Sequence, residues 1–168
     1  MRTISILAPG IIAAAMSSSA FAQGADQKFI KEAIEGNLAE VQMGQLAQQN
    51  GQSQGVKDFG QMLVTDHGQA NTKAQSVAQS MNVTPPTEPN AKQKKEYDKM
   101  SKLNGPAFDK AFAQHMVTDH KKDIAAFQKE TKSKNQQVAG FASETLPTLQ
   151  KHLQTAQSLQ KGGRAAKQ

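Results

Sequence analysis

The chain has 168 residues, with 20 lysines and arginines against 14 acidic residues, which gives a formal net charge of +6. It contains no cysteine, which excludes disulfides and metal sites built from thiolates. Nothing in the sequence supports a phosphate-binding glycine loop, a dinucleotide fingerprint or a serine–histidine–aspartate triad.

The first 22 residues have the pattern of a signal peptide. Arg2 is followed by a short apolar run, which is interrupted by a Pro-Gly pair and ended by three serines. The run falls short of the roughly 20 apolar residues that a membrane-spanning helix needs. Ala20 and Ala22 are the small residues that signal peptidase reads, so cleavage is predicted before Gln23. We therefore expect a protein of the periplasm or outer envelope, whose mature chain has no transmembrane span.

Apolar residues in the remaining chain recur at spacings of three and four, which predicts helices. A proline-rich stretch at residues 83–89 cannot lie inside a helix, because proline lacks the backbone N–H. It separates two pairs of long helices, and each pair has a connection short enough to require an antiparallel hairpin. The predicted helices, of which the third is short and basic, are Asp26–Gln49, Ser53–Met81, Lys92–Leu103, Pro106–Lys132 and Lys134–Leu159.

Two hairpins joined by one long crossover are typical of the ferritin-like variant of the four-helix bundle. The sequence therefore predicts an all-α fold: a ferritin-like four-helix bundle over residues 23–160, with the short fifth helix in the crossover. A signal peptide at residues 1–22 precedes the bundle, and a flexible basic tail at residues 161–168 follows it. The crossover returns along the bundle, so the second and fourth predicted helices run parallel to each other.

Three of the four histidines are candidates for a metal site. At 100° per residue, His152 lies at the centre of the apolar stripe of its helix, and His67 lies beside the stripe of its own. In the fourth predicted helix the same count places Asp119 on the stripe and His120 beside it. A rise of 1.5 Å per residue brings His67 and His120 to one level of the bundle.

Glu40 flanks the stripe of the first helix and comes within one to two turns of that level. Buried charge is costly unless it is paired or binds a metal ion. We therefore predict a metal site, with iron, zinc, copper or manganese as candidate ions. The predicted ligands are Glu40, His67, Asp119, His120 and His152.

Two alternatives to a metal site remain open. Aspartate–histidine hydrogen bonds between helices would satisfy the same groups without a metal ion. A ferritin-like metal-dependent oxidase is the other alternative, but the Glu-x-x-His motif of di-iron bundles is absent from the chain. We also expect burial to dominate at His152, which would lower its pKa and keep the imidazole neutral.

Six segments carry a family resemblance: Ala39–Ala47, Val56–Phe59, Met62–His67, Phe108–Phe112, Met116–His120 and Leu146–Leu153. They resemble a bacterial family known as domain of unknown function four-one-four-two, often labelled as predicted outer-membrane or exported proteins. The resemblance covers nearly all of residues 26–160. It implies a ferritin-like bundle in the periplasm or at the outer envelope, and it implies no reaction.

The leading functional hypothesis is an exported bundle that binds a metal ion or small ligand without catalytic turnover and acts in envelope stress. The alternative is a structural or interaction module of the envelope. Its basic face, at residues 92–102, would then contact an anionic surface polymer or a protein partner, including another copy of the chain. Nucleic acid is not an expected partner, because the basic segment lacks a recognisable nucleic-acid-binding fold.

Overall fold

The structure is a computed structural model that describes residues 13–165, with side chains described for residues 23–162. Its elements are α1 (Ala13–Asn50), α2 (Gln54–Ser80), α3 (Ala91–Met100), α4 (Gly105–Glu130) and α5 (Gln136–Ala165). The predicted all-α fold is confirmed: the described residues contain helices and no strand. None of these helices, over the described residues, is long and apolar enough to span a membrane.

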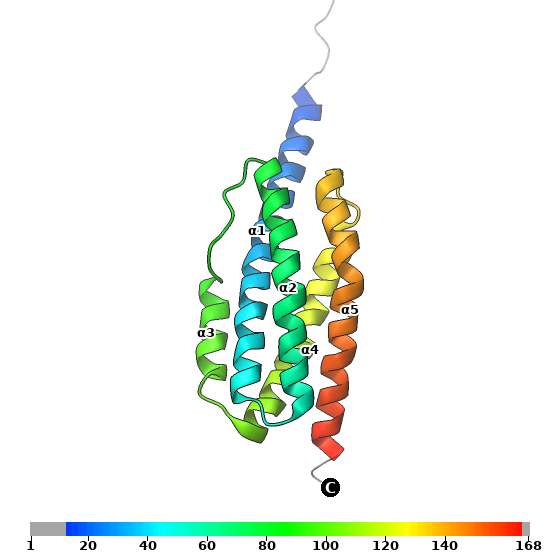
Figure 1. Ribbon diagram of the computed structural model, residues 1–168. Helices are drawn as coiled ribbons and strands as arrows, with labels where there is room; N and C mark the ends of the chain where they lie inside the picture. The colour runs from blue at the N-terminus through cyan, green and yellow to red at the C-terminus, as the bar shows by residue number, and fades with distance from the viewer. Residues whose placement is uncertain (1–12, 166–168) are drawn as a thin grey trace, which may run out of the picture.

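The helices form two antiparallel hairpins, α1 with α2 and α4 with α5 (Figure 1). The connection from α2 returns along the outside of the bundle and carries α3, so α4 runs parallel to α2 (Figure 1). The predicted bundle with a long crossover is therefore present, whereas kinship with the ferritins stays a prediction.

The helix ends differ from the predicted ones mainly at the two termini. α1 begins at Ala13 rather than Asp26, and α5 continues to Ala165. Residues 1–12 of the predicted signal peptide and residues 166–168 of the predicted tail lie outside the described residues. The three helices between α1 and α5 end within three residues of the predicted positions, where proline, asparagine and glycine interrupt the pattern.

The first hairpin packs tightly because two glycines face each other across it. A Cβ added to Gly44 would come within 2.5 Å of the Gly60 carbonyl oxygen, and one added to Gly60 would come within 2.6 Å of the Gly44 carbonyl oxygen. Only glycine permits this approach. The turn between α1 and α2 is held to α4, because the backbone N–H groups of Gln52 and Ser53 donate to the Asp109 carboxylate at 2.9 and 2.8 Å.

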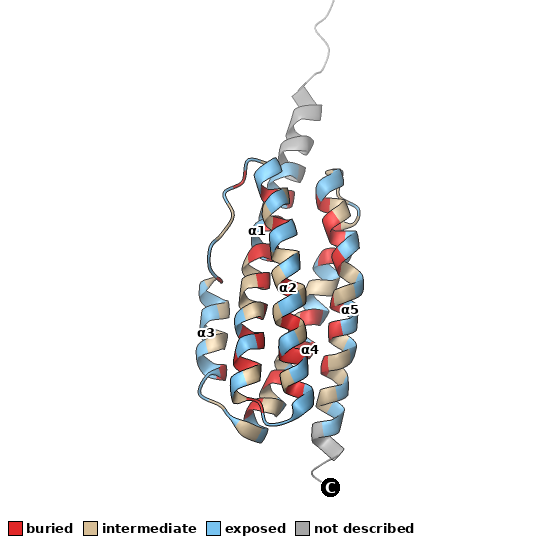
Figure 2. Cartoon of the chain, viewed as in Figure 1, coloured by how far each residue is buried: buried red, intermediate tan, exposed pale blue. Residues whose placement is uncertain are grey.

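The short helix α3 is fixed at its first residue and lies outside the four long helices. Asn90 caps it by accepting from the backbone N–H groups of Lys92 and Gln93, and the Gln93 side chain accepts from the Asn90 N–H. The Asn90 amide also donates to Glu35 on α1 at 3.1 Å. α3 contacts α1 and α4, so it covers the groove between them and exposes most of its own surface (Figure 2).

The core consists of two apolar clusters, with a polar layer between them. On α5, Leu149 belongs to one cluster and Ala156 to the other, and buried His152 lies between them. Each of the other three long helices likewise contributes to both clusters, with buried polar residues between the two contributions. The buried polar residues at this level of the bundle are Asn37, Glu40, His67, His120 and His152.

Candidate metal centre

Three histidines from three helices meet in this polar layer. His67 on α2, His120 on α4 and His152 on α5 are exposed by only 3%, 0% and 0%. Their ring centroids form a nearly regular triangle with sides of 5.2, 5.3 and 5.7 Å. One nitrogen from each ring can be chosen so that all three lie within 4.8 Å of one another. In the part of the chain that the structure describes, no other group of three or more histidine, aspartate and glutamate side chains meets this criterion.

Oxygen acceptors fix which nitrogen of two of these rings carries a proton. The His120 Nδ1–H donates to the Met116 backbone carbonyl at 3.0 Å. The His152 Nε2–H donates to the Asp66 carboxylate at 2.9 Å. Neither acceptor can donate a proton, so the neutral rings keep their lone pairs on His120 Nε2 and His152 Nδ1. Such outward bonds orient the histidine ligands of metal sites.

His67 follows the same pattern from the opposite side of the layer. Its Nδ1–H donates to the Asn37 side-chain oxygen on α1 at 2.9 Å. Its other nitrogen, Nε2, is buried and has no hydrogen-bond partner among the described residues. An unpaired buried polar atom is uncommon and costs free energy. The third imidazole therefore also presents a lone pair without a protein donor.

Burial keeps all three imidazoles neutral at neutral pH. It lowers the pKa of His67 well below its usual value, with further contributions from His120 and His152. It lowers the pKa of His120 to about 4, although the bond to the Met116 carbonyl opposes the shift. The pKa of His152 is also lowered, because burial outweighs the Asp66 carboxylate. The predicted direction for His152 is confirmed, and neutral imidazole is the form that binds metal ions.

The spacing of the two fixed rings suits a shared cation. His120 Nε2 and His152 Nδ1 lie 3.3 Å apart, and both carry lone pairs when the rings are neutral. Two acceptors at this distance repel each other unless a proton or a metal ion lies between them. Two nitrogens bound about 2.05 Å from one tetrahedral ion are themselves about 3.3 Å apart. The His67 ring supplies the third nitrogen, which lies within 4.8 Å of the other two rings' ligand atoms and must move closer to bind the same ion.

Phe59 lies against two of the three rings. Its centroid is 5.8 Å from that of His152 and 6.4 Å from that of His120. The side chain is 1% exposed and belongs to one of the two apolar clusters next to the polar layer. The imidazoles are therefore held in surroundings of low dielectric constant, which disfavour proton binding.

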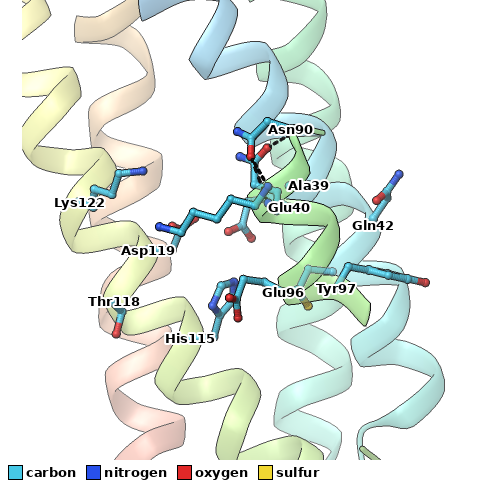
Figure 3. Close-up of a pocket in the computed structure, with 13 residues that line it drawn as sticks. Ala39, Glu40, Gln42, Asn90, Glu96, Tyr97, His115, Thr118, Asp119 and Lys122 are labelled. Atoms are coloured by element: carbon cyan, nitrogen blue, oxygen red, sulfur yellow. Dashed lines mark hydrogen bonds between the residues drawn. The ribbon is translucent and has the colours of Figure 1, made fainter. Parts of the chain in front are cut away.

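The predicted five-residue set is divided in the structure. The three imidazoles meet, whereas Glu40 and Asp119 lie next to each other at a separate cavity between α1, α3 and α4 (Figure 3). The helical-wheel placement on α4 was wrong: His120 is fully buried, and Asp119 is only partly buried. α4 contacts α5 and also α1 and α3, so its buried face is broader than a single stripe.

Burial and neighbouring negative charge raise the pKa values of Glu40, which lines this cavity, and of Asp123, which is close enough to affect it. The pKa of Glu40 is well above its usual range because the side chain is buried, and Asp119 and Asp123 add to the shift. Burial and Asp119 raise the pKa of Asp123 to about 7. The cavity has a volume of about 320 Å³. Its walls come from residues 39–43 of α1, residues 90–97 at the start of α3, and residues 115–122 of α4.

The oxygen acceptors around the imidazoles were not part of the predicted site. Two of these acceptors could have been noticed in the sequence. Asp66 is the residue before His67, and Asn37 lies on the apolar stripe of α1. An asparagine on an apolar stripe was the available signal. The Met116 carbonyl carries no side-chain signal, although it lies one helical turn before His120.

Comparisons with known proteins identify a family without assigning an activity. No curated protein and no solved structure matches the chain. A family described as Domain of unknown function (DUF4142) matches residues 12–159, which is most of the sequence. The chain therefore belongs to the DUF4142 family, as its sequence resemblance indicated.

Proposed function

We propose that this protein is an exported metal-binding protein of the bacterial envelope, in which His67, His120 and His152 bind one transition-metal ion. The observation that carries the proposal is which nitrogen of each imidazole ring is protonated and which keeps its lone pair. Each ring donates one N–H to an oxygen acceptor, the remaining nitrogens of His120 and His152 lie 3.3 Å apart, and the remaining nitrogen of His67 is buried without a partner among the described residues. A metal-free network would leave these nitrogens without a donor.

The donor set favours some of the candidate ions over others. Three neutral imidazoles suit zinc, copper and ferrous iron, whereas manganese prefers oxygen ligands. The tetrahedral spacing of His120 and His152 favours zinc among these. Three protein ligands leave a coordination position to water or to another ligand. We propose binding or buffering of the ion without turnover.

Export and a role in envelope stress are the remaining parts of the proposal. The signal-peptide pattern at residues 1–22 supports export. An envelope protein meets metal ions before cytoplasmic proteins do, and a buried three-histidine site would hold such an ion away from redox partners. N-terminal sequencing of the protein from a periplasmic fraction tests export, with Gln23 expected as the first residue.

Elemental analysis and X-ray absorption test the metal site directly. We expect about one zinc, copper or iron ion per chain in protein purified from the native envelope without chelator. The absorption spectrum should show nitrogen neighbours at about 2.0–2.1 Å with the scattering pattern of imidazole. Protein that carries no metal, and that takes up none from a micromolar Zn²⁺ solution, would contradict the proposal.

A further inference from the structure

The cavity between α1, α3 and α4 is a second polar site, separate from the three histidines. Its volume of about 320 Å³ falls in the range of sites that hold small molecules. α3, which is held in place by the Asn90 cap and its bond to Glu35, forms the outer wall (Figure 3). The cavity is therefore a consequence of the crossover rather than of the four-helix core.

The cavity contains a buried carboxyl group with an unpaired oxygen atom. Glu40 is only 3% exposed, and its Oε2 atom has no hydrogen-bond partner among the described residues. The carboxyl group of Asp119 lies beside it at the same cavity (Figure 3). Two carboxylates can only accept hydrogen bonds, so neither satisfies the other unless a proton or an outside donor is supplied. A buried carboxylate without a donor is costly.

The outer end of the cavity has the opposite charge. Lys92 on α3 and Lys122 on α4 line the cavity and are exposed, and Glu96, the third acidic residue of the lining, is paired with Lys99 at 2.9 Å. The half-buried Tyr97 also lines the cavity, on the side away from Asp119 and Lys122 (Figure 3). A ligand that fits this distribution has a cationic end with several N–H donors and an anionic end a few bonds away.

A metal ion fits this cavity less well than an organic cation. In the described part of the chain, the acidic residues here do not bring three ligand atoms within 4.8 Å of one another. An ion bound by two carboxylates alone would leave most of the cavity volume unused. A primary ammonium supplies three N–H donors, which two carboxylates can accept, and its carbon chain fills the remaining space.

We propose that this cavity binds a small zwitterion with a primary ammonium at one end and a carboxylate at the other. The ammonium donates to Glu40 and Asp119, and the carboxylate lies between Lys92 and Lys122. The site is independent of the histidine cluster and does not require a metal ion there.

Three probes of equal chain length separate the contributions of the two ends: 4-aminobutyrate, n-butylamine and butyrate. Binding to the purified protein in chelator is measured by calorimetry and by amide chemical shifts. We expect 4-aminobutyrate to bind most tightly, n-butylamine more weakly, and butyrate not to bind. The shift changes should be confined to the residues of α1, α3 and α4 that line the cavity.

Substitutions assign the ends to residues. Glu40→Gln and Asp119→Asn should each weaken both amines at least about tenfold, because each removes a charged hydrogen-bond acceptor. The double substitution of Lys92 and Lys122 by glutamine should weaken 4-aminobutyrate up to about fivefold and leave n-butylamine unchanged, as expected for exposed charges. Asp98→Asn is the matched control, since Asp98 lies on α3, is exposed and does not line the cavity.

Several results would overturn this inference. They are the absence of amine binding at concentrations on the order of 10 mM, butyrate binding as tightly as n-butylamine, and amine affinity that is unchanged in both acidic variants. Should Glu40→Gln fail to fold, Asp119→Asn and the three probes on the wild type still decide the question. Loss of Zn²⁺ binding in Glu40→Gln would assign the carboxyl pair to the metal site and end the zwitterion proposal, while leaving the metal proposal intact.

Discussion

The histidine cluster and the carboxyl pair are both buried polar regions, but burial shifts the pKa values of imidazole and carboxyl groups in opposite directions. It lowers the pKa values of the imidazoles and raises those of the carboxyl groups of Glu40 and of nearby Asp123. The imidazoles also have fixed acceptors for their outer N–H groups, whereas Glu40 has no partner for Oε2. The histidine cluster therefore presents unprotonated nitrogen atoms, whereas the carboxyl pair presents an oxygen atom that has no hydrogen-bond donor.

Each region therefore accepts a different cation. Three neutral imidazoles, each with one nitrogen within 4.8 Å of the others, suit a metal ion. Carboxyl groups at the inner end of a cavity of about 320 Å³ suit an organic ammonium. The two regions also share α4, on which Asp119 and His120 are consecutive residues that face different sites.

The largest expected effect is the loss of metal-linked stability in His120→Gln. Free Zn²⁺ at 100 times the dissociation constant should stabilise the wild type by about 2.7 kcal/mol, which raises Tm by roughly 5–10 °C for a domain of this size. Thermal unfolding of His120→Gln should show no such increase. His115→Gln is the control, because His115 lies at the cavity and outside the cluster. Equal Zn²⁺ responses in His120→Gln and the wild type would contradict the metal site.

The second prediction concerns the pH dependence of the metal-free protein. The pKa of His120 is lowered to about 4 in the folded state, against about 6.5 in the unfolded chain. The unfolded state therefore binds more protons between these values, and stability falls as pH drops from about 6.5 to 4. In denaturant titrations, the free energy of unfolding of His120→Gln should fall by about 3 kcal/mol less than that of the wild type over this pH range. An unchanged slope would show that His120 is accessible to solvent protons in the fold.

Removing an outer acceptor should weaken the metal site without destroying it. Asn37→Leu leaves the His67 Nδ1–H without its oxygen partner, so the ring is less well oriented. We expect Zn²⁺ affinity to fall about tenfold, as is typical for a group that orients a ligand. Calorimetric titration measures the change. The control is Asn71→Leu, one turn after His67 on α2, whose Zn²⁺ affinity should match that of the wild type.

The smallest expected effect has the opposite pH sign and belongs to the carboxyl region. The pKa of Asp123 is raised to about 7, so its contribution to stability is present at low pH and lost as pH rises from about 4 through 7. Asp123→Asn should therefore gain stability relative to the wild type over this range. Asp123 retains some solvent contact, so we expect about 1 kcal/mol at pH 8. If the stability gain of Asp123→Asn instead grew towards low pH, the pKa of Asp123 would not be raised in the fold.

The sequence was sufficient to predict the helices, the long crossover and the position of the histidines along the bundle axis. Apolar spacing and the proline-rich segment define the four long helices, and a count of residues along two parallel helices places His67 and His120 together. These inferences depend on local periodicity and on the fixed rise of the α-helix. Local rules of this kind act within one helix and do not depend on its neighbours.

Only the tertiary structure decided which polar residues belong to which site. Glu40 and Asp119 are close to the histidines in level, but they face the cavity that α3 covers. The oxygen partners of the imidazoles come from α1, from α2 and from the backbone of α4. Helix rotation and the packing of α3 set these directions, because a helix that contacts neighbours on several sides has no single buried face. Sequence periodicity therefore determined the polar layer, and helix packing divided that layer into two sites.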